Sequence, residues 1–150
     1  MPDLPKKKVG LISCSGEEMP EGTVTRRAVR KVLETLRPDD TVTLCLPLFL
    51  AGGEGERAFA RYYPTIAVDG CDKRCAALAT EKYSARPAVS IVVTDVSKVN
   101  DRKAIGTARR LNAEGLRLSD EVAGTIVKET DRLLKKKSKG NFRGVAGDER

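Results

Sequence analysis

The sequence contains no histidine and no tryptophan, and only 4% of its 150 residues are aromatic. Without histidine, this chain cannot supply imidazole metal ligands, a Ser-His-Asp triad or a Cys-His pair. Because aromatic side chains are so few, the core must be built from aliphatic residues such as Val, Leu, Ile and Ala. No apolar run approaches the roughly 18 residues that a membrane-spanning helix needs, so we expect no membrane span.

The N-terminal segment MPDLPKKK is basic and leads directly into an expected strand. It lacks the apolar stretch and the small-residue cleavage site of a signal peptide. We therefore expect a cytoplasmic protein, in which thiols stay reduced. In that compartment the four cysteines of the chain indicate metal ligands or redox groups rather than disulfides.

The formal net charge of +7 lies mostly at the two ends of the chain. Residues 1–8 carry three lysines and one aspartate (+2), and residues 135–150 carry six basic and two acidic groups (+4), which leaves +1 for the rest. The Lys135–Lys137 run also lacks the interleaved aromatic residues on which bases stack. The sequence therefore does not favour nucleic-acid binding, and the expected partner is a metal ion.

Apolar runs and turn residues alternate along the chain in a pattern that predicts the order β-α-β-α-β-α-β-α-α. Strands are expected at 8–14, 41–46, 65–69 and 88–95, and helices at 23–37, 54–62, 71–83, about 101–112 and about 120–137. Ser119 is the expected N-cap of the last helix. This order predicts an α/β fold: a single three-layer domain with a mostly parallel four-stranded sheet, flavodoxin- or Rossmann-like, and helices on both faces. The flavodoxin-like strand order 2-1-3-4 is favoured.

The composition divides the chain into three parts. Residues 1–8 form a basic N-terminal lead, and residues 9–137 form a single α/β metal-binding domain. Residues 138–150, SKGNFRGVAGDER, are polar and rich in glycine, so we expect a flexible basic tail.

Three of the four cysteines follow expected strands. Cys14 ends the run VGLISC, Cys45 ends TVTLC, and Cys71 follows TIAVDG. Because the carboxyl ends of parallel strands share one edge of a sheet, these thiols are expected to meet where open α/β sheets bind ligands. Cys75 lies four residues after Cys71, on the same face of the first turn of an expected helix, where the helix N-terminus lowers the thiol pKa. Taken singly, Cys14 and Cys45 would each be interpreted first as a small buried apolar residue, and it is the pair Cys71 and Cys75 that favours a metal site.

Three segments of the chain, ISCSGEEMPEGTVTRRA, LCLPLFLAGGEGERAFA and TIAVDGCDKRCAA, resemble the DGC-domain family, which is named for its Asp-Gly-Cys motif. Here that motif is Asp69-Gly70-Cys71, and the resemblance covers roughly residues 9–100. The family is described by four cysteines thought to chelate zinc. The resemblance implies that the corresponding ligands in this chain are Cys14, Cys45, Cys71 and Cys75.

Four thiolates are a soft donor set that suits tetrahedral zinc or an iron–sulfur cluster. The sequence therefore predicts a zinc-binding protein with a four-cysteine site at the carboxyl edge of the sheet, in a structural or metal-handling role. The alternative is an iron–sulfur or thiol-dependent redox enzyme that uses the same four cysteines. With four protein ligands a zinc site is closed and normally structural, whereas one unbound cysteine would leave an open position that could serve chemistry.

Overall fold

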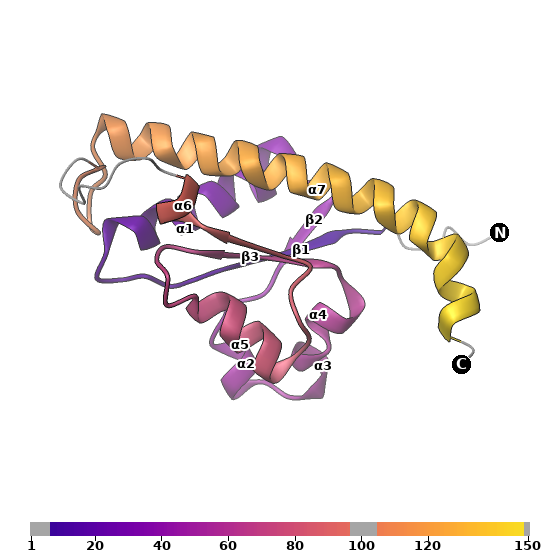
Figure 1. Ribbon diagram of the computed structural model, residues 1–150. Coiled ribbons are helices and arrows are strands. Elements are labelled where there is room, and N and C mark those ends of the chain that lie inside the picture. Colours follow the sequence, from indigo (N-terminus) through magenta and orange to yellow (C-terminus); the bar gives the residue numbers. More distant parts are fainter. Residues whose placement is uncertain (1–6, 97–104, 149–150) are drawn as a thin grey trace.

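The computed structural model describes residues 7–96 and 105–148, with side chains described as far as Lys136 (Figure 1). The described residues contain four strands, β1 (Val9–Ser13), β2 (Thr41–Thr43), β3 (Thr65–Asp69) and β4 (Val89–Val92). They form one parallel sheet in the order β2-β1-β3-β4. The predicted α/β class and the 2-1-3-4 order are confirmed, and the sheet is parallel throughout.

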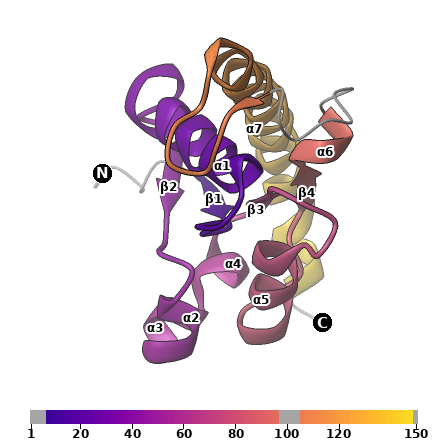
Figure 2. The same cartoon turned by 90° about the vertical axis from the view of Figure 1, so that its left-hand side faces the viewer.

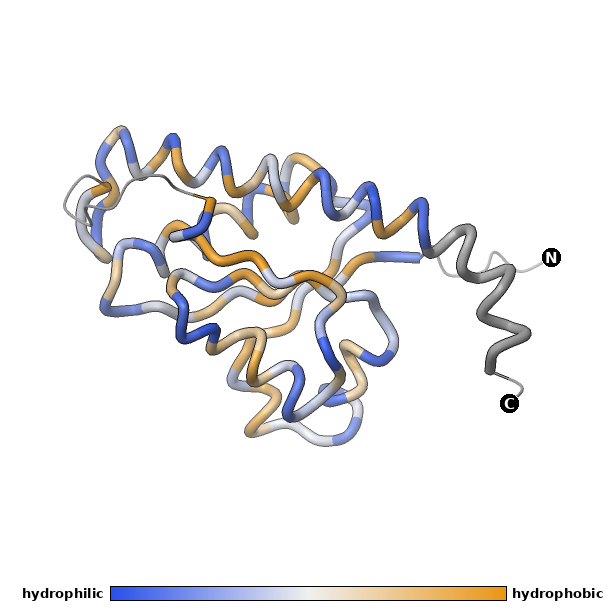
Figure 3. The backbone as a smooth tube through the Cα atoms, viewed as in Figure 1, coloured by the Kyte–Doolittle hydropathy of each residue, from blue (hydrophilic) through white to orange (hydrophobic). Residues whose placement is uncertain are grey.

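One face of the sheet is covered by α1 (Pro20–Lys31), which continues into a π-helical turn η1 (Val32–Leu36), and by α7 (Ala113–Asp148) (Figures 1 and 2). The short helix α6 (Val93–Val96) lies on the same side directly after β4. As predicted, the core between these layers is aliphatic, and hydrophobic residues are concentrated along the strands (Figure 3). Its buried side chains include Val9, Leu11, Val24, Ala28, Ile66, Val68, Val122 and Ile126.

The other face of the sheet is covered by four shorter helices, α2 (Leu48–Ala51), α3 (Glu54–Arg57), α4 (Phe59–Tyr62) and α5 (Cys75–Tyr83). A second core fills this layer and includes Ile12, Phe49, Phe59, Ala67 and Ala76. Gly10 of β1 leaves room for the ring of Phe59, because a Cβ at this position would lie 2.5 Å from the ring atom Cε1. The two layers of helices complete the predicted three-layer domain.

The connection between β4 and α7 differs from the prediction. A helix was expected at about 101–112, but residues 105–112 form a tight turn with an antiparallel bridge between Gly106 and Leu111, while 97–104 lie outside the described residues. Gly106 has a φ of +103°, a left-handed conformation that favours glycine and interrupts a helix. The helical prediction is therefore wrong for the described part of this segment.

Helix α7 begins earlier than predicted because a different residue caps it. The side-chain oxygen of Asn112 accepts the backbone N–H of Gly115 at 3.0 Å, which is the role of an N-cap. Ser119, the predicted cap, is instead buried inside the helix and donates its hydroxyl to the Gly115 carbonyl at 2.9 Å. The helix was expected to end near residue 137, and it extends to Asp148. The flexibility of 138–150 and the limits of the three expected parts of the chain stay predictions.

An ion pair fastens α7 to the end of η1. The guanidinium of Arg37 donates from Nε and Nη2 to the two carboxylate oxygens of Asp131, both at 2.9 Å. Beside this guanidinium the pKa of Asp131 is held below its ordinary value of 3.8. The bidentate geometry ties the longest helix to the edge of the domain next to β2.

None of the helices in the described part of the chain is both long and apolar enough to cross a membrane.

Candidate functional site

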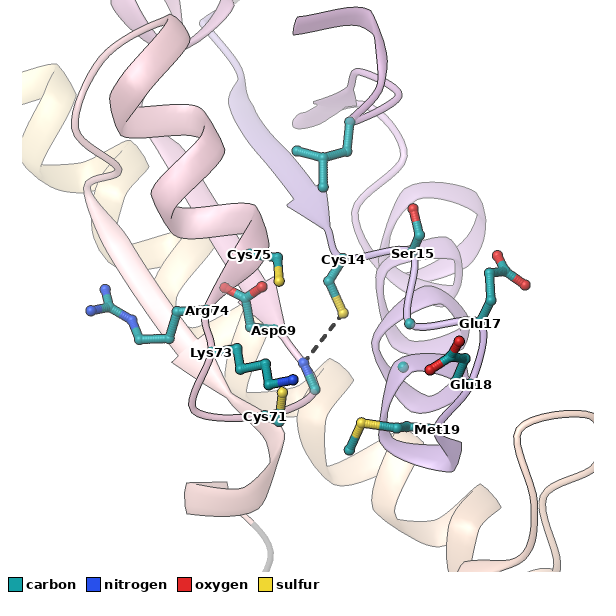
Figure 4. Close-up of a pocket in the computed structure, with 14 residues that line it drawn as sticks. Cys14, Ser15, Glu17, Glu18, Met19, Asp69, Cys71, Lys73, Arg74 and Cys75 are labelled. Carbon is teal, nitrogen blue, oxygen red and sulfur yellow. Dashed lines mark hydrogen bonds between the residues drawn. The ribbon is translucent and has the colours of Figure 1, made fainter. Parts of the chain in front are cut away.

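A cavity of about 430 Å³ opens at the carboxyl ends of the two central strands, β1 and β3 (Figure 4). The chain leaves β1 towards α1 on one face of the sheet, and leaves β3 towards α5 on the other. The two connections diverge from adjacent strands and leave a crevice between them, which is where open α/β sheets bind ligands. The lining consists of Cys14, Ser15, Gly16, Glu17, Glu18, Met19, Gly22, Leu46, Asp69, Gly70, Cys71, Lys73, Arg74 and Cys75.

Three glycines allow the backbone to pack closely beneath this cavity. Gly16 has a φ of +48°, and the place where its Cβ would stand is occupied by the backbone of Gly22 at the start of α1. A Cβ on Gly70 would lie 2.9 Å from the carbonyl carbon of Glu21 and 2.9 Å from the nitrogen of Gly22. The loop after β1, the start of α1 and the turn after β3 therefore meet through main-chain atoms.

Cys14 lies at the centre of the site and is buried, with 9% of its surface exposed. The N–H of Gly70 donates to its sulfur at 3.4 Å, and the Thr25 hydroxyl lies 3.5 Å from the same sulfur. Because that hydroxyl donates to the Gly22 carbonyl at 2.6 Å, it is free to accept the Cys14 S–H. Burial raises the pKa of the Cys14 thiol, so the thiol is neutral at neutral pH unless a cation binds it.

Asp69, the last residue of β3, is buried against the start of α5. One carboxylate oxygen accepts the N–H of Ala76 at 2.6 Å, and the other accepts the N–H of Ala77 at 3.1 Å. Asp69 thus caps α5 from a distance in sequence, which fixes Cys75, the first residue of the helix. Burial raises the pKa of Asp69 above its ordinary value, and it outweighs the opposing effect of these two hydrogen bonds.

Cys71 and Cys75 do not share a helix face as predicted. The helix begins at Cys75, while Cys71 lies in the preceding turn, in which its carbonyl accepts the N–H of Arg74 at 3.2 Å. Arg74 adopts the left-handed conformation (φ 52°, ψ 47°), so the chain cannot be helical through this turn. Even so, the Cys71 and Cys75 side chains line the same cavity as Cys14, and Figure 4 shows the three sulfurs on it.

Cys45 is separate from the other three cysteines. Strand β2 ends at Thr43, so the chain has left the sheet before Cys45, whose thiol is exposed. Cys45 lines a neighbouring depression, and Cys14 lines both that depression and the central cavity. The next residue, Leu46, lines the central cavity itself.

The expected convergence of four sulfurs on one centre is therefore not observed. Within residues 7–96 and 105–136, no three Cys, Asp or Glu side chains lie close enough together to hold a metal ion. Three of the four predicted ligands nevertheless line one cavity. Their thiols form a soft donor set, and an N–H group already donates to one of the sulfurs, as is common around metal thiolates. The donors fit zinc in chemical type, although they are not assembled around a centre.

The charged groups at the cavity are not equivalent. Lys73 and Arg74 both line the cavity, but the Arg74 side chain points away from the three cysteines in Figure 4 and donates to the Ser90 hydroxyl at 3.1 and 3.2 Å. On the α1 side, Glu17 accepts from Arg26 at 3.0 Å. Lys73 has no ion-pair partner within the part of the chain that the structure describes, so its ammonium group is available to a ligand.

The sequence model of the DGC domain matches residues 10–116, more than half of the chain. The chain belongs to the DGC domain family. No curated protein and no solved structure matches it in the comparisons made.

The three residues of the name motif have separate tasks in this DGC domain. Asp69 caps α5, Gly70 allows the close backbone contact with α1 and donates its N–H to Cys14, and Cys71 supplies a thiol. The sequence pointed to Cys71 as a ligand but not to the cap, because Asp69 accepts hydrogen bonds from residues seven and eight positions later. It also missed Thr25, although a threonine beside the apolar stripe of α1 is a signal of a buried polar contact.

Proposed function

We propose that this DGC domain binds a zinc ion through cysteine thiolates at the carboxyl edge of its sheet. The observation that carries the proposal is that Cys14, Cys71 and Cys75 line a single cavity although they come from different elements. In a chain without histidine, thiolates are the donors best suited to zinc. Bound zinc would supply cross-links between the loop after β1 and the turn after β3.

The chain's own residues would support such a site electrostatically. Thiolate ligands carry negative charge, which the Gly70 N–H that donates to Cys14 would offset, and Lys73 adds a positive charge to the lining of the same cavity. Cys14 must lose its proton in order to bind, so proton release should accompany metal uptake. Since metal binding energy adds to folding energy, a structural role and a metal-handling role differ in how much the fold depends on the ion.

The test is elemental analysis of the purified full chain, together with replacement of the ligands. One zinc per chain is expected, and Cys71→Ser should reduce the zinc content to a small fraction. Met19→Leu is the matched control, because Met19 also presents sulfur to the cavity but is not a proposed ligand. It should leave the metal content unchanged.

Two results would overturn the proposal. Stoichiometric iron with visible absorbance would assign the same thiols to an iron–sulfur cluster, and a metal-free protein under reducing conditions would remove the metal altogether. Where zinc is found, chelation separates the two roles. A lower melting temperature after metal loss indicates a structural ion, and an unchanged melting curve indicates metal handling.

A further inference from the structure

We propose that the edge of the sheet at which the strands begin, the amino edge, binds single-stranded nucleic acid, with a base stacked on Tyr62 and phosphates held by Lys136 and Arg61. This surface lies at the opposite end of the strands from the cysteines, so the inference does not depend on the zinc proposal. It begins from an open depression of about 380 Å³ between α4, α7 and the residues before β3 and β4. The lining includes Arg61, Tyr62, Pro64, Ala88, Leu133 and Lys136.

The fold gathers basic residues at this edge. Because the four strands are parallel, every segment that leads into a strand does so here. Lys7 and Lys8 precede β1, and Arg86 precedes β4. Helix α7 begins near the carboxyl edge and runs back over the sheet, which brings Lys135 and Lys136 to the amino edge (Figure 1). Positive charge from the two ends of the sequence therefore meets at one end of the domain.

The charge along this edge is uneven. On the side of β2 it is balanced, because Arg37 is bound by Asp131 and the acidic pair Asp39-Asp40 precedes the strand. On the side of β3 and β4 the basic residues prevail. The Arg61 guanidinium lies 3.6 Å from the Glu54 carboxylate, but the Glu54 side chain is 87% exposed, so this ion pair is weak. The depression therefore has a surplus of positive charge that attracts a polyanion.

Tyr62 supplies the aromatic group that the Lys135–Lys137 run lacks in the sequence. It is 65% exposed and lines the same depression as Lys136. Its ring meets the ring of Tyr63 edge to face, with centroids 4.7 Å apart, and Tyr63 in turn contacts the buried Phe59. These contacts hold the exposed ring in place beside the cations. An oriented ring next to a basic groove is the arrangement on which single-stranded bases stack.

The ring decides between classes of polyanion. A surplus of positive charge alone would admit an acidic peptide or a duplex as readily as a single strand. An acidic peptide offers carboxylates but no base to stack on Tyr62, and the bases of a duplex are already stacked on one another. The combination of Tyr62 with Arg61 and Lys136 therefore favours a single strand.

Fluorescence anisotropy of the full chain with a labelled oligothymidylate of about 12 nucleotides tests the proposal over a series of salt concentrations. Tyr62→Ala should weaken binding roughly five- to a hundredfold without changing the salt dependence, and Tyr62→Phe should bind like the parent. Lys136→Gln should reduce the slope of log affinity against log salt by about 0.7, the contribution of one phosphate contact in a single strand. Arg109→Gln is the charge-matched control, because Arg109 is exposed in the turn at the other end of α7, and it should leave both quantities unchanged.

Three results would overturn the inference: no binding at low salt, an unchanged affinity in Tyr62→Ala, or a duplex or polyglutamate of the same length that binds as tightly as the single strand. All four substituted residues are exposed or lie at the surface, so melting curves of the variants should match the parent. None of the variants alters a proposed zinc ligand, and their zinc content should equal that of the parent. The nucleic-acid and zinc proposals can therefore fail separately.

Discussion

Replacing Asp69 by alanine should destabilise the domain, because it removes both acceptors that hold the first turn of α5. Loss of an N-cap costs about 0.5–2 kcal/mol, and each buried N–H left without an acceptor costs about 1–3 kcal/mol. Asp69 lines the cavity, so water can reach the freed N–H groups of Ala76 and Ala77 and recover part of this cost. We therefore expect a loss of about 2 kcal/mol, which for a domain of this size lowers the melting temperature by about 4–8 °C.

The raised pKa of Asp69 reduces the expected loss at neutral pH. A folded-state pKa above the ordinary value of 3.8 means that the folded protein holds this proton more tightly than the unfolded chain. Ionisation then costs the folded state free energy as the pH rises from 3.8 through the raised pKa. The difference in stability between the parent and Asp69→Ala should therefore be larger below this window than above it.

Chemical denaturation and thermal melting of the metal-free proteins measure the effect, and Asp72→Ala is the control. Asp72 lies in the same turn but is exposed, so its replacement should change the stability little. In the metal-loaded form, Asp69→Ala should also weaken metal binding by about tenfold or more, because Cys75 begins the helix that Asp69 caps. Equal melting temperatures for Asp69→Ala and Asp72→Ala would refute the capping role.

Three further predictions concern packing, charge and the C-terminus. Gly70→Ala should lower the stability of the domain by about 1–3 kcal/mol, because the new Cβ would lie 2.9 Å from backbone atoms. Gly124→Ala is the control: this position in α7 is open, so alanine should stabilise the domain. Equal melting temperatures of the two variants would contradict the close packing at Gly70. Asp131→Asn should lower the melting temperature at neutral pH. The difference in melting temperature should disappear as the pH falls through the lowered pKa of Asp131, because protonation of Asp131 breaks the ion pair with Arg37 in the parent as well. A difference that persists in strong acid would exclude the ion pair as its source. Deleting residues 138–150 should leave the melting temperature and metal content unchanged, since Phe142 and Val145 are the segment's only sizeable apolar residues, and metal loss on truncation would show otherwise.

The sheet could be predicted from the sequence because its signals are local. The run at 65–69 coincides with β3, and strands expected at 8–14 and 88–95 contain β1 and β4. The alternation with helices then limits the topology, since parallel strands need right-handed crossovers. The strand order followed from this pattern and from the preference of small domains for a flavodoxin-like arrangement.

The details of the site depended on interactions that a linear pattern does not contain. The start of α5 is set by a carboxylate at Asp69 and by the left-handed conformation of Arg74, and neither has a periodic signal. Cys45 was expected at the sheet edge because TVTLC has the pattern of a single strand, but β2 stops at Thr43 and the chain turns into α2. The helix expected at about 101–112 is likewise interrupted by a local turn, which forms at Gly106 although the apolar spacing of this segment is helical.

Main chain forms the base of the cavity where Gly16, Gly22 and Gly70 meet, and this determines how the site can evolve. A larger residue at any of the three would have to displace backbone, so substitutions there are expected to be eliminated by selection. Glu18 and Lys73 are exposed and have no such restriction, so they can be exchanged without disturbing the fold. Homologues that have diverged in ligand preference should therefore differ at the rim and retain the same glycine base.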